Sequence, residues 1–486
     1  MRLCLINHHF RYEIEKLVRI FLPFEKQECF ETAEISDLCL TTEFIENSAK
    51  AVLYFGGKTY ESVVKIENIN NNPEKDMELH LALAVFDVFT AATGYFPDWG
   101  ILTGVRPAKL YSRLKKDFGE NNAKEYFANY LKVKENKISL CERTLKGEGE
   151  ITSLSRPDSF SLYISIPFCP TRCSYCSFVS HSIEMAKKLM PDYVKLLCEE
   201  IIETAKIAKS YNLRLETIYI GGGTPTTLSA EQLEAVMKTV SENFDFTYLR
   251  EYTVEAGRPD TITRDKLLTI KKWGATRISI NPQTMNDDVL KAIGRNHTAL
   301  ETINAFNLAR ECGFVNINTD LIAGLPTDTF ESFKNTLTKV LTLNPESVTV
   351  HSLSMKRSSK LTTSGSLPEI ETGKTAATMV DYALKTLESS EIVPYYMYRQ
   401  SKTVGNLENV GYSKSGFECL YNVFIMDETH TILSCGASAV TKLREPYGDY
   451  IERVFNFKYP YEYITNFKEI LNRKHKICEF YDTYKT

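Results

Sequence analysis

The residues best suited to chemistry are three cysteines spaced four and three residues apart. Cys169, Cys173 and Cys176 follow the apolar run 162–166, so they share one loop at the end of a predicted strand. Three thiolates can bind three of the four irons of a cubane cluster and leave the fourth iron open for chemistry. Two other interpretations stay open: a zinc site completed by His181, and buried thiols that lie together by chance.

A run of glycines follows the next apolar run of the sequence, residues 217–220. Gly221, Gly222 and Gly223 are followed by Thr224. Consecutive glycines let the backbone approach a ligand closely and present N–H donors to it. On its own, such a run more often marks a tight turn.

Polar side chains also follow three later β-rich runs. Each one alone is typical of a cap or a solvated loop residue. Together, at successive strand ends, they predict a convergent polar set. The residues are Glu255, Gln283, Arg295 and Asp320.

The elements that must position these residues are short β-rich runs separated by longer helical stretches. This alternation predicts βαβ units, a parallel sheet and a full or partial TIM-like barrel, that is, an α/β fold. In such barrels the chemistry lies at the C-terminal ends of the strands, where each motif falls. The runs are 162–166, 217–220, 252–254, 277–280, 315–321 and 347–350.

The sequence predicts three domains. Residues 1–155 are expected to form an N-terminal α+β domain, with strands in 30–40 and 50–66 and a helix over 79–92. Gly56 and Gly57 are expected to form a hairpin turn. We place the barrel core and a C-terminal extension that covers the substrate in the two remaining segments, 156–360 and 361–486.

Three further stretches are ambiguous. Arg106 could clamp a carboxylate, but a turn followed by a helix is favoured there. The segment 392–400 carries three tyrosines, an arginine and a glutamine, which could surround a flat aromatic substrate or form an amphipathic strand. Residues 355–373 are predicted to form a loop.

Composition restricts the partners and the location. The formal net charge of the 486 residues is −4 and no lysine or arginine block stands out, so nucleic-acid binding is not supported. We find no apolar run long enough for a membrane span and no secretory leader, and we expect a cytoplasmic protein. Nine of the twelve cysteines are scattered, as in a reducing compartment, and this abundance suits an anaerobe.

The cysteine loop, with Tyr175 before its last cysteine, resembles that of the radical S-adenosylmethionine (SAM) enzymes, over residues 161–416. The other motifs resemble the branch of oxygen-independent coproporphyrinogen III oxidases, haem chaperones and haem-degrading methyltransferases. The resemblance implies a [4Fe-4S] cluster on Cys169, Cys173 and Cys176, with SAM on its open iron. It implies SAM contacts from Tyr163, Gly222, Gly223, Thr224, Glu255, Gln283, Arg295 and Asp320.

The sequence resembles most the second bacterial type of coproporphyrinogen dehydrogenase. That type implies an oxidoreductase of haem biosynthesis in which a SAM-derived 5′-deoxyadenosyl radical initiates oxidative decarboxylation of coproporphyrinogen III propionates to vinyl groups, giving protoporphyrinogen IX. The implied partners are a tetrapyrrole and a reduced flavodoxin or ferredoxin-type electron donor. A haem chaperone and a haem-directed radical methyltransferase stay open as alternatives.

Two positions depart from the patterns of the branch. Phe178 stands where the oxidases carry a further cysteine, and Gly405 stands where the chaperones carry a histidine. The second departure counts against axial haem ligation by this segment.

Overall fold

The computed structural model describes residues 1–32, 36–176, 181–182, 188–354 and 370–484, which form two compact units. Unit 1 consists of Met1–Thr144, Gly365–Ala377 and Met397–Asn409. Unit 2 consists of Leu145–Ser364, Thr378–Tyr396 and Val410–Thr486. No helix in the described part of the chain combines the length and apolar character needed to cross a bilayer.

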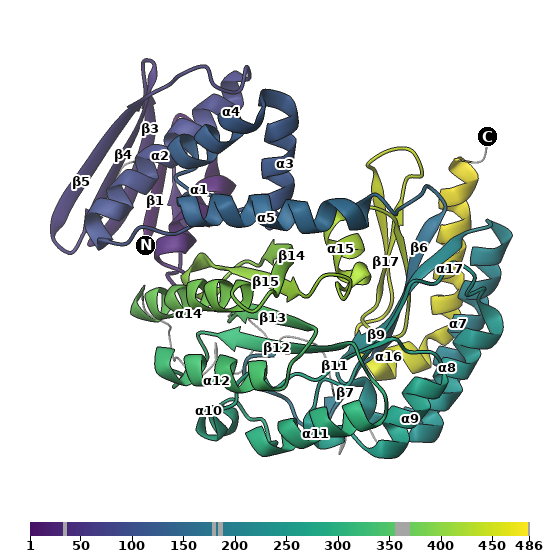
Figure 1. The fold of residues 1–486 in the computed structure, drawn as a ribbon. Coiled ribbons are helices and arrows are strands. Elements are labelled where there is room, and N and C mark those ends of the chain that lie inside the picture. The colour runs from purple at the N-terminus through teal and green to yellow at the C-terminus, as the bar shows by residue number, and fades with distance from the viewer. Residues whose placement is uncertain (33–35, 177–180, 183–187, 355–369, 485–486) are drawn as a thin grey trace. The chain divides into compact units, whose positions relative to one another are not determined.

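Unit 1 is built on a five-stranded sheet of order β2-β1-β3-β4-β5, in which β1 is parallel to both of its neighbours and the other pairs are antiparallel. Its strands are β1 Arg2–Ile6, β2 Glu28–Phe30, β3 Leu38–Ile45, β4 Ser48–Phe55 and β5 Lys58–Lys65. Helices α1 and α2 pack together, and α2 covers β4 and β5 (Figure 1). The α-helices of this unit are α1 Arg11–Phe21, α2 Pro73–Thr93, α3 Pro107–Phe118, α4 Glu120–Glu125 and α5 Glu135–Thr152, and α5 continues into unit 2.

The local predictions for this unit are largely confirmed. Phe55 pairs with Lys58, so Gly56 and Gly57 form the two-residue turn of a hairpin. The predicted helix lies inside α2, and α3 begins directly after Arg106. The strand character predicted over 30–40 is found at the two ends of this range, where β2 ends at Phe30 and β3 begins at Leu38.

Unit 2 is organised by an 11-stranded sheet of order β14-β15-β13-β12-β11-β10-β9-β6-β16-β17-β18. The six predicted runs are confirmed as consecutive parallel neighbours, β6 to β13. Among the described residues, the first and last strands of this order, β14 and β18, do not pair with each other. The sheet is therefore an open, partial barrel. The strands are β6 Ser159–Ile166, β9 Arg214–Gly222, β10 Glu251–Glu255, β11 Arg277–Ser279, β12 Ile317–Ala323, β13 Ser347–Ser352, β14 Val393–Arg399, β15 Glu408–Ser413, β16 Thr431–Cys435, β17 Val440–Arg444 and β18 Ile451–Phe455.

Helices line the outer face of the parallel strands (Figure 1). The segment 355–369 of the predicted loop lies outside the described residues, and α14 begins at Ile370, earlier than the predicted boundary at Gly373. The helices are α7 Met190–Ser210, α8 Ala230–Asn243, α9 Arg264–Lys272, α10 Asp287–Ala292, α11 Ala299–Glu311, α12 Phe330–Thr342, α14 Ile370–Glu388, α15 Leu420–Asp427, α16 Pro460–Thr465 and α17 Phe467–Thr483.

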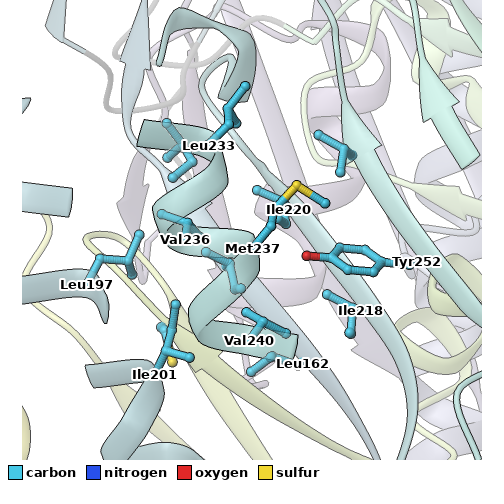
Figure 2. Packing of buried hydrophobic residues seen from close by; sticks show 14 of the residues in the cluster. Leu162, Leu197, Ile201, Ile218, Ile220, Leu233, Val236, Met237, Val240 and Tyr252 are labelled. Carbon is cyan, nitrogen blue, oxygen red and sulfur yellow. The ribbon is translucent and has the colours of Figure 1, made fainter. Parts of the chain in front are cut away.

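The core of unit 2 lies between the sheet and these helices. Ile218 and Ile220 of β9 and Tyr252 of β10 pack against Val236 and Met237 of α8 (Figure 2). Successive strand residues point to opposite faces, so the side chains between these positions point to the inner face of the sheet. Each fully buried apolar side chain contributes about 1.5–3 kcal/mol to the stability of the folded protein. This contribution determines which side chains of each strand pack against the helices and which ones point to the inner face.

A buried ion pair joins the last helix to this core. The ammonium Nζ of Lys474 in α17 lies 2.8 Å from Oε1 of Glu200 in α7, and both side chains are buried. Glu200 also accepts hydrogen bonds from the Gly436 N–H and the Tyr463 hydroxyl. The pair therefore holds the loop that follows β16.

We predict that Lys474→Met destabilises the protein by about 3–5 kcal/mol, because it leaves the Glu200 carboxylate buried without its partner. The free energy of unfolding from urea denaturation measures this change. The double variant Glu200→Gln with Lys474→Met should recover most of the loss. The control is Lys206→Met, which removes the exposed pair with Glu203 on the same helix as Glu200 and should cost under about 1 kcal/mol.

Candidate active site

The inner face of the parallel strands carries many polar side chains. At the positions between the apolar core residues, β10 carries Glu251, Thr253 and Glu255, and β12 carries Asn318 and Asp320. Parallel sheets in α/β proteins usually read as continuous apolar runs, because both of their faces are covered. An inner wall of hydroxyl, amide and carboxyl groups is therefore suited to a polar ligand.

Three aromatic rings lie against each other at this wall. Tyr163 of β6 stacks on Tyr219 of β9 at 6.3 Å, and Tyr421 of α15 stacks on Tyr219 at 4.6 Å between ring centroids. The Tyr219 hydroxyl donates a 2.6 Å hydrogen bond to Oε1 of Glu255. Burial raises the pKa of Glu255 to about 7, against the lowering effect of this hydrogen bond.

Asp320, the second predicted carboxylate, lies in the opposite electrostatic environment. It accepts a 2.7 Å hydrogen bond from Nδ2 of Asn318, and its Oδ2 lies 3.7 Å from Nε2 of His351. Burial raises the pKa of Asp320, but His351 and Asn318 outweigh this effect and lower it overall. The two carboxyl groups therefore titrate in different pH ranges, which is the usual arrangement for distinct acid and base roles.

The glycine run is held directly against the start of the cysteine loop. The Gly223 N–H donates to the Ile166 carbonyl and the Thr224 N–H to the Phe168 carbonyl, at 2.8 and 2.7 Å. A Cβ atom on Gly223 would lie 2.5 Å from the Phe168 oxygen, so only glycine allows this approach. The Thr224 hydroxyl then reaches the Cys169 sulfur at 3.6 Å.

A second loop supports the cysteine loop from the other side. The Ser174 N–H donates to the Ile293 carbonyl at 3.0 Å, and the Thr171 hydroxyl donates to the Gly294 carbonyl at 3.2 Å. Within the described ranges, no three His, Cys, Asp or Glu side chains are arranged so that they could hold a metal ion. The structure thus brings the predicted cysteines onto one supported loop, and their role as ligands stays a prediction.

Arg295 and Gln283 both lie in the part of the chain that joins β11 to β12. The buried guanidinium of Arg295 donates to the Asn281 carbonyl, and the Gln283 N–H donates to the Asp320 carbonyl at 3.0 Å. Burial lowers the pKa of Arg295, but the neighbouring Tyr175 and Cys173 groups outweigh this and raise it. Arg295 therefore stays positively charged beside the cysteine loop.

Sequence reasoning missed several residues of the site. The strand alternation around the glycine run could have found Tyr219, whereas Tyr421 comes from a distant helix without any local signal. His297 and Arg258 were also missed, and both are buried.

The structure gives the tyrosine-rich segment 392–400 a regular conformation. It forms the strand β14, and Tyr395 and Tyr396 are buried. Arg399 is also buried and donates to the carbonyls of Leu102 and Asn406. The interpretation as a strand is therefore confirmed. Phe178, the other departure from the oxidases, lies outside the described residues.

Comparisons with known proteins identify the family of the chain. Residues 163–340 match the model of the radical SAM superfamily. The chain is 37% identical over 409 residues to the oxygen-independent coproporphyrinogen-III oxidase-like protein HemZ of Bacillus subtilis, covering 83% of this chain and 82% of that protein. The chain belongs to this radical SAM family.

Two further relatives cover less of the chain. The haem chaperone HemW of Bacillus subtilis is 40% identical over 194 residues, which is 40% of this chain and 50% of HemW. The solved structure of coproporphyrinogen III oxidase (HemN) from Escherichia coli has a TM-score of 0.50 and 24% identity over 66% of this chain and 71% of that chain. This structural similarity supports the radical SAM α/β fold alone.

Membership of the radical SAM family implies a [4Fe-4S] cluster and SAM, and the residues present fit these groups. Three thiols within eight residues supply the soft donors that iron–sulfur clusters require. The positive charge of Arg295 faces one of them. The polar wall with Tyr163, Glu255 and Asp320 offers hydrogen-bond groups for SAM, and each residue of the predicted set lies at this edge of the sheet or in its loops.

The shifted pKa of Glu255 leads to a prediction on stability. A folded-state pKa of about 7, above the ordinary 4.5, means that the folded protein holds this proton more tightly than the unfolded chain. The resulting stabilisation is complete below pH 4.5 and is lost as the pH rises to about 7. The Glu255→Gln variant stays neutral, so its stability relative to the unchanged protein should increase over this range and then level off.

Urea denaturation of both proteins between pH 4.5 and 8.5 measures this difference. In a protein that carries Tyr219→Phe, which removes the hydrogen bond that lowers the pKa, the difference should level off only above pH 7. A stability difference that does not vary with pH would contradict the assignment.

Proposed function

We propose that the chain is a radical SAM oxidoreductase that converts propionate side chains of coproporphyrinogen III into vinyl groups, giving protoporphyrinogen IX in haem biosynthesis. The observation that supports this most directly is the similarity to an oxidase-like relative across more than four fifths of both chains. In the overall change each converted propionate loses one hydrogen atom to the SAM-derived radical, one electron to an external electron acceptor, and CO2. A reduced flavodoxin or ferredoxin-type protein would supply the electrons that start the reaction.

The cluster and SAM, when bound, supply the hydrogen-abstracting chemistry, and the protein supplies position and environment. Cys169, Cys173 and Cys176 would hold the cluster. The stacked rings of Tyr163 and Tyr219 present an apolar surface that keeps water from the reacting atoms. Glu255, whose pKa is about 7, can hold a proton at the inner wall, while Asp320 stays ionised.

The partial match to HemW makes a haem chaperone the second candidate. One contact within unit 1 argues against it. Gly405, at the position expected for the chaperone histidine, has a φ of +66°, and a Cβ atom there would lie 2.9 Å from the Gly373 oxygen in α14. A histidine at this position would need α14 to move, so the local packing disfavours this route to haem ligation.

The proposal predicts a substrate-dependent reaction under anaerobic conditions. The protein is reconstituted with iron and sulfide, reduced, and mixed with SAM in the presence and absence of coproporphyrinogen III. We expect 5′-deoxyadenosine and CO2 to increase only when the porphyrinogen is present, with mono- or divinyl products detected by mass spectrometry. A variant with all three loop cysteines changed to alanine is the control.

Other outcomes would point to the alternatives. Stable one-to-one haem binding without any decarboxylation would contradict the proposal and favour the chaperone. A methylated tetrapyrrole without vinyl products would contradict it in favour of a radical methyltransferase.

Gly405→His tests the packing argument separately. We expect it to destabilise the protein by about 1–3 kcal/mol more than Gly416→His and to give no stoichiometric haem binding. Gly416 also has a positive φ, of +83°, but no atom lies within 4 Å of a Cβ placed there, so this control separates crowding from backbone strain. Urea denaturation and haem titration are the measurements. Tight haem binding by Gly405→His with unchanged stability would refute the packing argument.

A further inference from the structure

Arg258 makes a direct contact with the cysteine loop that the predicted site does not include. It follows β10, three residues after Glu255, and only 3% of it is exposed. Its Nη1 donates to the Cys173 sulfur at 3.6 Å, and its Nη2 donates to the Thr171 hydroxyl at 3.2 Å. One guanidinium therefore contacts two positions of the same loop.

The guanidinium is held in a fixed orientation from behind. Its Nε donates to Oδ1 of Asp260 at 3.1 Å and its Nη2 to Oδ2 at 3.2 Å, which is a bidentate ion pair. The Arg258 carbonyl accepts hydrogen bonds from the N–H and the hydroxyl of Thr261, at 3.0 and 2.8 Å. Because both ends of the residue are fixed, its position relative to Cys173 is defined by the strand end and not by the loop.

Among the three cysteines, Cys173 is the one at which a hydrogen bond from a guanidinium has the largest effect, because it is the most buried. Only 7% of Cys173 is exposed, whereas Cys169 and Cys176 are partly exposed. Water can hydrogen-bond to a sulfur at the surface, but a buried sulfur depends on donors from the protein. In a buried setting, both the N–H and the positive charge act with little screening.

We propose that Arg258 is a positioning residue that stabilises the reduced form of the cluster through its hydrogen bond to Cys173. This inference rests on the cluster assumed in the proposed function. Reduction adds one negative charge to the cluster, and hydrogen bonds to its sulfurs raise its reduction potential. Arg295 also has a side-chain hydrogen bond to Cys173, but the guanidinium of Arg258 is in addition oriented by its ion pair with Asp260.

The test compares anaerobically reconstituted full-length variants by iron content and by redox titration followed with electron paramagnetic resonance. We expect Arg258→Met to bind the cluster and to weaken its reduction at least tenfold, which is a shift of about 59 mV to lower potential for one electron. Arg258→Lys keeps the charge and a donor and should recover part of the shift. Asp260→Asn keeps the guanidinium but loosens its orientation and should give an intermediate value.

The control is Arg264→Met, which removes an exposed arginine of α9 that pairs with Glu311 of α11. Its cluster should have an unchanged potential. If Arg258→Met loses iron, Arg258→Gln takes its place in the titration, because its uncharged amide is two chain atoms shorter than the guanidinium and loses both the charge and the reach to the Cys173 sulfur. A normal potential in any fully loaded Arg258→Met or Arg258→Gln variant overturns the inference, whereas an unchanged protein that binds no cluster contradicts the proposed function itself.

Discussion

The alternation of apolar and polar side chains along six parallel strands is the constraint on which the site depends. Residues such as Ile218 and Ile220 must face the helices to form the core, and this requirement turns their neighbours inward. A shift of one residue in any strand would bury polar groups against the helices. The hydrophobic effect on the outer face therefore determines which polar groups meet on the inner face.

The same constraint explains how two carboxyl groups on one wall come to differ. Strand alternation places both Glu255 and Asp320 on the inner face of the sheet, but their neighbours come from different strands. Glu255 meets the aromatic rings around Tyr219, whereas Asp320 meets Asn318 and His351. Desolvation dominates at the first carboxyl, and hydrogen bonds and charge dominate at the second.

The sequence was sufficient for features that depend on local pattern. The strand runs, the Gly56–Gly57 turn and the order of the motifs all follow from periodicity and turn chemistry. It was not sufficient for features that depend on contacts between distant segments. Tyr421 and Arg258 reach the site through tertiary packing, and no spacing rule connects them with the cysteines. The short strand β1 was not predicted, because its two buried residues, Leu3 and Cys4, are adjacent and point to opposite faces. The sequence of this strand therefore shows no alternation of apolar and polar residues.

The cysteine loop itself has little structure of its own, with only the two-residue strand β7, Phe168–Cys169, inside it. Its conformation comes from its neighbours: the glycine run contacts its start, the carbonyls of Ile293 and Gly294 hold its middle, and Arg258 contacts Thr171 and Cys173. These supports follow three different strands, β9, β10 and β11. A loop motif that is short and polar can thus be positioned accurately, because the strand order of a buried sheet fixes the points to which it is attached.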